Sequence, residues 1–159
     1  MVTDASRATQ EAFDAVQAYA LTQPEYAGLW IDQLQDPVGE SGFDVASFVL
    51  NVTFTGDPAR HEAALREIYG GPLCVSGAER SAAELDEIRA GLPVVLASAE
   101  AEAAGIYASG GASYGTDVTR NVVVATVFAV TGDGQAWLDA RYGAGAVVLS
   151  SMLSVVEVP

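Results

Sequence analysis

The chain has 159 residues, half of them hydrophobic, and carries 21 carboxylate side chains against seven basic ones, for a net charge of −14. A chain of this length and hydrophobicity can bury a sizeable core without a metal or a disulfide, and its composition differs from that of a disordered protein. Its strongly negative surface would repel nucleic acids and anionic membranes, so we exclude both as partners.

Crosslinking and targeting signals are scarce. The single cysteine, Cys74, excludes an internal disulfide and a thiolate metal cage. It stands in the apolar run 72–75, which predicts a buried strand in which Cys packs as a small apolar residue. No apolar run has the length of a membrane span, and residues 1–7 lack the features of a signal peptide. We expect no metal or other cofactor.

The hydrophobic pattern predicts an opening helix followed by strands and further helices. Residues 4–22 place apolar side chains on one helical face, with Asp4 or Ser6 as the cap and Pro24 beyond the end. Stretches rich in Val, Phe and Thr between turn residues predict strands. These strands cover residues 26–32, 45–55, 72–76, 121–130 and 146–158.

Two later helices carry capping signals. Asp57 is a natural N-cap, and Pro58 follows it at the first helical position, where a missing N–H costs nothing. Ser81 and Glu84 have the spacing of a capping box. We expect the helix that they begin to end at Pro93.

Three short motifs of the first half recur in the second half, in the same order and 73 to 77 residues later. They are Ala-Gly-x-aromatic at 27–30 and 104–107, Thr-Gly-Asp at 55–57 and 131–133, and Tyr-Gly at 69–70 and 142–143. The recurrence predicts an internal duplication of a β-β-α-β unit.

Two such units predict an α+β fold in which a mixed or antiparallel sheet carries its helices on one face. We expect a single compact domain over residues 1–159, made of an N-terminal helix (1–25), a first repeat (26–92) and a second repeat (104–158). The edges and the open face of the sheet would then be the natural surface for a partner.

No catalytic constellation emerges from the residues. His61 is the only histidine, so a Ser-His-Asp or Cys-His scheme would have to use it. Its spacing to Leu65 places the imidazole beside an apolar stripe, and Trp137 fills the corresponding position of the second repeat, so packing is the favoured role. The repeated carboxylates Asp57 and Asp133 are explained as helix caps.

Other polar segments also have structural explanations. The acidic stretch 32–44 lacks the spacing of a calcium loop and predicts a solvated loop. Its carboxylates are Asp32, Asp36, Glu40 and Asp44. The Gly-rich segment 109–111 lacks the Lys and the helix of a phosphate-binding loop, so we expect a hairpin connection. The aromatic residues Trp30, Tyr107 and Trp137 are expected in the core.

Three segments combine into a recognisable pattern. They are Tyr-Ala-Gly-Leu-Trp-Ile-Asp at 26–32, the acidic helix at 81–88, and Asp117 and Asn121 ahead of three valines at 122–124. The pattern, which covers most of residues 10–130, resembles the pro-regions of secreted actinobacterial chymotrypsin-fold proteases of the streptogrisin and alpha-lytic type. The resemblance implies a non-catalytic module of a secreted or cell-envelope protein.

In that family the pro-region assists folding of the protease and inhibits it. Its sheet adds to a strand of the protease, and its C-terminal tail occupies the active-site cleft. By position, the resemblance assigns protein binding to Val155, Val156, Glu157, Val158 and Pro159.

Three functions follow from these observations. The favoured one is a non-enzymatic binding module that binds another protein through a sheet edge. The second is a homo-oligomeric structural or small-ligand-binding protein with a pocket between the repeats. The third is an enzyme that uses His61 with Asp57 or Glu62.

Overall fold

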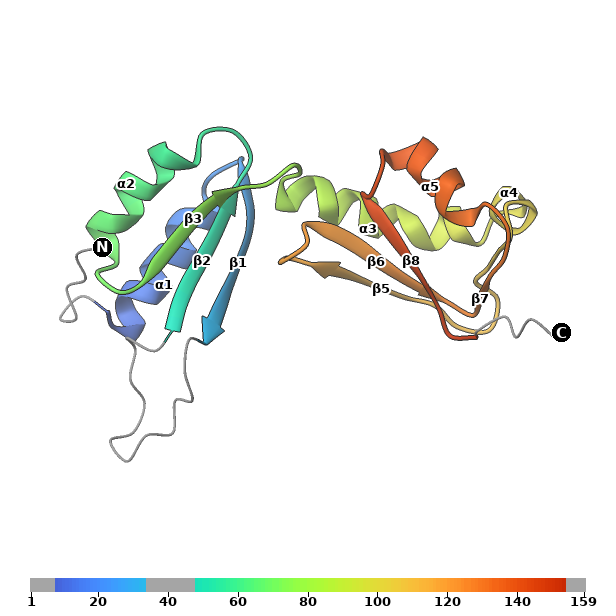
Figure 1. Cartoon of the computed structure of the whole chain (residues 1–159), viewed down its shortest axis with the longest axis horizontal. Coiled ribbons are helices and arrows are strands. Elements are labelled where there is room, and N and C mark those ends of the chain that lie inside the picture. The colour runs from blue at the N-terminus through green and yellow to red at the C-terminus, as the bar shows by residue number, and fades with distance from the viewer. Residues whose placement is uncertain (1–7, 34–47, 154–159) are drawn as a thin grey trace, which may run out of the picture. The chain divides into compact units, whose positions relative to one another are not determined.

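The computed structural model describes residues 8–33 and 48–153. Five helices and mixed or antiparallel sheets within these residues confirm the predicted α+β class, and the N-terminal helix is present (Figure 1). The sequence predicts one compact domain, whereas the structure divides into two compact units, residues 1–83 (unit 1) and 84–159 (unit 2). Each unit has its own sheet and hydrophobic core.

Unit 1 is a three-stranded sheet covered by two helices on one face. Its elements are α1 (Gln10–Leu21), β1 (Tyr26–Gln33), β2 (Phe48–Phe54), α2 (Pro58–Ile68) and β3 (Leu73–Gly77). The central strand β2 pairs antiparallel with β1 and, after the α2 crossover, parallel with β3. Alternate residues of β2 meet both helices in one core, which includes Val16, Ala20, Leu50, Val52, Phe54 and Leu65.

The ends of the unit 1 helices follow capping chemistry. Helix α1 begins after Thr9, whose hydroxyl accepts the backbone N–H of Ala12 (3.1 Å). The caps expected from the sequence, Asp4 and Ser6, lie outside the described residues. Asp57 is confirmed as the cap of α2, because its carboxylate accepts the backbone N–H of Ala59 (3.0 Å).

Unit 2 also has a three-stranded sheet, with a short two-stranded extension. Its elements are α3 (Ala82–Leu96, beginning at the boundary), α4 (Ala99–Ala103), β4 (Ile106–Tyr107), β5 (Ser113–Asp117), β6 (Val122–Val127), β7 (Ala129–Val130), α5 (Gly134–Tyr142) and β8 (Val147–Ser151). Strand β6 pairs antiparallel with β5 and, after α5, parallel with β8, while β4 pairs antiparallel with β7. The core includes Leu85, Leu92, Leu96, Val123, Ala125, Val127 and Leu138.

The two units therefore share an antiparallel strand pair followed by a helix and a parallel strand. The duplication inferred from the sequence itself stays a prediction.

Three local expectations for unit 2 are wrong. Helix α3 continues through Pro93 to Leu96, because Leu92 and Leu96 are buried one turn apart and their packing outweighs the lost hydrogen bond. The Gly-rich segment 109–111 is not a hairpin, since β4 and β5 pair with β7 and β6 and not with each other. Asp133 stands at the N-cap of α5, but its side chain makes no capping hydrogen bond.

Candidate functional site

The sheet edges are the first place to look for a partner surface. The strands β3 and β8, which pair in parallel with the central strands, each form one edge of their sheet. On the outer side of these two strands, helix side chains bind backbone groups. In unit 2, Gln135 donates to the carbonyl of Val147 (2.8 Å) and accepts the N–H of Leu149 (3.0 Å). In unit 1, Arg66 donates to the carbonyl of Leu73 (2.8 Å). An added strand would have to break these bonds at β8 and β3, so β5 and β1 are the more accessible edges.

The hydrogen-bond register shows which groups of β5 point outward. The N–H of Val123 donates to the carbonyl of Ala146, just before β8 (2.9 Å), so the backbone groups of Val123 point toward β8. Those of its neighbour Val124 point the other way, toward β5. Gly115 lies opposite Val124, so the backbone N–H and C=O groups of Gly115 point toward β6. Tyr114 and Thr116 therefore direct their backbone N–H and C=O groups away from the sheet, where an extended segment could pair with them.

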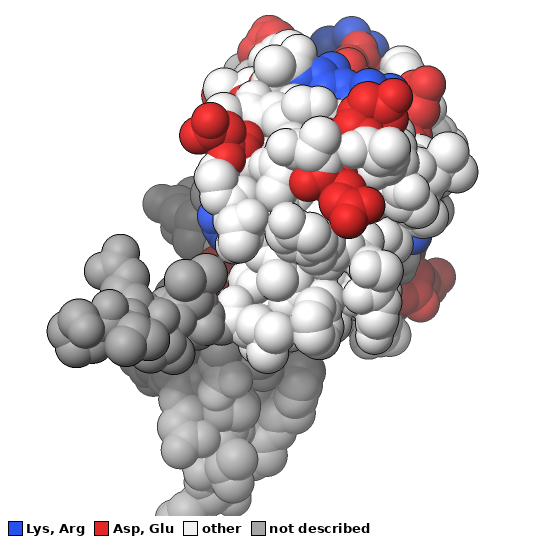
Figure 2. Space-filling model, turned by 90° about the vertical axis from the view of Figure 1, so that its right-hand side faces the viewer, with Lys and Arg blue, Asp and Glu red and all other residues white. Residues whose placement is uncertain are grey.

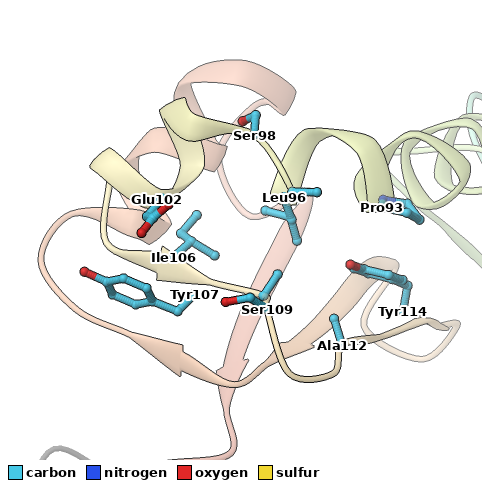
Figure 3. Close-up of a pocket in the computed structure, with 11 residues that line it drawn as sticks. Pro93, Leu96, Ser98, Glu102, Ile106, Tyr107, Ser109, Ala112 and Tyr114 are labelled. Carbon is cyan, nitrogen blue, oxygen red and sulfur yellow. The ribbon is translucent and has the colours of Figure 1, made fainter.

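A pocket of about 370 Å³ lies beside this edge in unit 2 (Figure 3). Leu96 of α3 and Ile106 of β4, both almost fully buried, form its apolar floor. In Figure 3 the Tyr114 ring extends from β5 with its hydroxyl end toward Leu96. Residues of the loop that connects β4 to β5 form one wall of the pocket. Gly110 and Gly111 in this loop have φ of 116° and 133°, a region that favours glycine.

Polar groups surround the apolar floor. Tyr107, Ser109 and Tyr114 contribute hydroxyls, and Glu102 of α4 contributes a carboxylate. Within residues 8–33 and 48–153, the Tyr114 hydroxyl and the Glu102 carboxylate have no side-chain partner. Burial raises the pKa of the Tyr114 phenol, so it remains a protonated donor at neutral pH. The pocket can thus hold an elongated group with an apolar body and a polar end.

Exposed apolar side chains adjoin the pocket. Tyr107, Phe128, Met152 and Leu153 are each at least a third exposed. The backbone N–H groups of Met152 and Leu153 donate to the carbonyls of residues 127 and 128, which brings the backbone of these two residues next to that of Phe128. Figure 2 shows a broad uncharged area on this end of unit 2, with acidic side chains gathered along one side of it. Such an area is typical of an interaction surface.

His61 belongs to the core of unit 1, as its spacing predicts. It is 1% exposed, its ring stacks on Phe54 (centroids 3.9 Å apart, planes 11° apart), and its Nδ1 lies 3.2 Å from the Tyr19 hydroxyl. The carboxylates considered as its partners have other contacts: Asp57 caps α2, and Glu62 pairs with an arginine of the same helix.

Two residues expected in the core lie on the face of unit 1 opposite the helices. Cys74 is exposed, because the β3 register turns its neighbour Leu73 toward the core and Cys74 away from it. Trp30 lies opposite Asn51 on the same face and is half-buried. Its indole N–H and the Asn51 amide both donate to Asp32 (3.3 and 3.0 Å). The core assignments of Cys74 and Trp30 are therefore wrong.

The other predicted aromatic positions differ from each other. Trp137 is half-buried and packs against the unit 2 core, in line with its expected role. Tyr107 is 37% exposed and lines the pocket, so it is not a core residue.

Several predicted positions lie outside the described residues. These are the tail residues Val155, Val156, Glu157, Val158 and Pro159, and the loop carboxylates Asp36, Glu40 and Asp44. Asp32 is described: it lies in β1, and its carboxylate accepts hydrogen bonds from Trp30 and Asn51.

A second pocket, of about 410 Å³, lies in unit 1 between α1 and the sheet. Apolar side chains such as Phe13, Leu50 and Tyr69 dominate its lining, and none of its lining residues is charged. It therefore offers volume but few groups that would orient a ligand.

Comparison with known proteins gives no family assignment. No protein-family model matches the chain, and a search of curated proteins finds no significant match. Among the described residues, no helix is long and apolar enough to cross a membrane, and no group of three or more His, Cys, Asp or Glu side chains could hold a metal ion.

The pocket beside β5 was missed from the sequence. Its signal is the Gly-rich segment flanked by Tyr107 and Tyr114, for which the sequence predicts a hairpin connection instead.

Proposed function

We propose that this chain is a non-enzymatic protein-binding module that adds an extended segment of its partner to the β5 edge. The observation that carries the proposal is the outward direction of the Tyr114 and Thr116 backbone groups beside a pocket, while the β8 edge is already bonded to Gln135. In strand addition, main-chain hydrogen bonds provide affinity and pockets for alternate side chains provide specificity.

The sequence resemblance suggests the class of partner. If the chain acts like the pro-regions described above, its partner is a secreted chymotrypsin-fold protease, and residues 155–159 enter the protease cleft. On the same basis we propose that the chain is a secreted or cell-envelope protein of actinobacterial type. The exposed apolar side chains of unit 2 support a protein partner, because they would be covered on binding.

The edge is tested with a matched pair of proline variants. Thr116→Pro removes an outward N–H of β5 without removing a bond to β6, and proline is tolerated at such edge positions. Ile31→Pro does the same at the β1 edge of unit 1. We measure inhibition and assisted refolding of a streptogrisin-type protease, and self-association by analytical ultracentrifugation.

The proposal expects Thr116→Pro to weaken the interaction at least tenfold and Ile31→Pro to leave it unchanged. In the unsubstituted chain, hydrogen exchange at the Tyr114 and Thr116 amides should slow when the partner binds, which tests the edge without a variant. Concentration-dependent self-association that Thr116→Pro abolishes would make a second copy the partner. No effect on any chymotrypsin-fold protease together with a monomeric chain would overturn the proposal.

A further inference from the structure

The pocket lies on the side of the sheet where a partner's alternate side chains would fall. Tyr114 and Thr116 lie opposite Ala125 and Val123, both fully buried under the helices, so their side chains are directed to the helix-covered face. Side chains of an added strand on that same face would lie next to Tyr114. Since Tyr114 lines the pocket, one of these side chains has direct access to it.

The lining defines the chemistry of that side chain. The floor of Leu96 and Ile106 suits an apolar stem, and Tyr107 and Tyr114 contribute two aromatic rings to the lining. Glu102 is the only charged residue of the lining, which contains no basic group. Unit 2 as a whole carries nine carboxylates and three arginines. This field disfavours an acidic side chain and favours a cationic one.

We infer that the pocket selects an arginine side chain of the partner segment that adds to β5, an inference that rests on the proposed function. Arginine has an apolar stem long enough to cross the floor and a planar guanidinium that stacks on aromatic rings and pairs with a carboxylate. Lysine offers the same charge but not the planar face, so it binds less well.

The inference is tested with blocked pentapeptides Thr-Val-Xaa-Val-Thr in which Xaa is Arg, citrulline or Glu. Citrulline has nearly the shape of arginine without its charge. Binding is followed by chemical-shift changes of the Tyr114 and Gly115 amides in the full chain at low salt. An exposed ion pair and a cation–π contact together predict that the Arg peptide binds roughly fivefold to tenfold more tightly than the citrulline peptide.

Two variants of α4 assign the preference to the pocket. Glu102→Gln should reduce the preference for Arg over citrulline to the part that the cation–π contact supplies. Glu100→Gln removes a carboxylate of the same helix outside the pocket and should keep the preference. Tyr107→Leu should reduce the preference, because it removes one ring while Tyr107 is exposed enough for the fold to tolerate the change.

The outcomes separate the two proposals. Equal binding of the Arg and citrulline peptides, with binding lost in Thr116→Pro, would overturn the arginine inference and leave the β5 edge as the binding site. A preference for Arg that neither Glu102→Gln nor Tyr107→Leu reduces would also overturn it. If none of the three peptides shifts the Tyr114 and Gly115 amides, strand addition at β5 fails and the inference fails with it.

Discussion

The side-chain amide of Gln135 donates to the carbonyl of Val147 over 2.8 Å, so helix α5 binds the outer edge of β8. The same side chain accepts the N–H of Leu149 (3.0 Å), and thus replaces two bonds that a neighbouring strand would make. Arg66 plays a similar part at the carbonyl of Leu73 in unit 1. Both parallel edges are therefore protected in their first half, a means of limiting unwanted strand pairing.

We expect Gln135→Ala to destabilise the protein by about 1–2 kcal/mol, because it leaves two partly buried backbone groups without their partner. It should also increase concentration-dependent self-association, because the β8 edge is opened. Urea unfolding and sedimentation measure the two effects. Gln135→Glu is the matched control, since it can still accept from Leu149 but cannot donate to Val147. An edge that stays monomeric in Gln135→Ala would contradict a protective role.

Thr116 holds a buried hydroxyl that lacks a hydrogen-bond partner among the described residues. Thr116→Val keeps the shape of the side chain and removes the unsatisfied oxygen, so we expect a stabilisation of about 1 kcal/mol. The midpoint of urea unfolding measures it. A loss of stability would show that the hydroxyl has a partner in solution, such as a bound water.

His61 contributes to stability through its stack on Phe54 and its contact with the Tyr19 hydroxyl. His61→Ala should cost about 2–4 kcal/mol because it opens a cavity in the core. His61→Phe retains an aromatic ring against Phe54 and should cost less. Thermal unfolding distinguishes the variants. The enzyme alternative requires the opposite pattern, in which His61→Gln abolishes an activity while stability is kept.

Cys74 should react with a thiol reagent in the native protein, because its side chain is exposed on the face opposite the helices. We expect complete labelling without denaturant at pH 8. Cys74→Ser should change the free energy of unfolding by less than about 0.5 kcal/mol, as for other surface positions. Labelling that needs denaturant would restore the buried-strand interpretation of the sequence.

The same Thr-Gly-Asp motif predicts a helix cap correctly at Asp57 but not at Asp133. Asp57 caps α2 as expected, because its backbone is extended (φ −92°, ψ 100°) and Pro58 fixes the backbone that follows. Asp133 has the same motif, but its backbone φ and ψ of −97° and 23° are not those of an extended cap residue. The motif therefore finds the start of α5 but not the contact.

Tertiary packing explains what the sequence does not predict. Proline is normally a helix breaker, yet Pro93 lies inside α3 because Leu92 and Leu96 must both reach the core. At a small residue such as Cys74, the sequence pattern does not distinguish the buried face of a strand from the exposed one. The pocket depends on where the chain leaves the edge at 108–112, and that is set by strand pairing between distant residues.

The turn after β5 should make stability depend on pH through Asp117. Its carboxylate accepts hydrogen bonds from the hydroxyl and N–H of Thr119 (2.8 and 3.1 Å) and from the N–H of Arg120 (3.1 Å). These bonds lower the pKa of Asp117 in the folded state below its ordinary value. The stabilisation is therefore present above the ordinary pKa of Asp and is lost as the pH falls through the lowered one.

We expect Asp117→Asn to reduce the loss of stability between neutral and acidic pH, and Thr119→Ala to raise the Asp117 pKa toward its ordinary value, because it removes the hydroxyl bond. Carboxyl NMR titration and urea unfolding at pH 7 and pH 3 measure these changes. Asp86→Asn serves as the control, since this carboxylate pairs with Arg89 on the exposed face of α3 (3.0 Å) and not with a turn. An Asp117 that titrates at the ordinary value in the intact chain would show that the turn is not held by these bonds in solution.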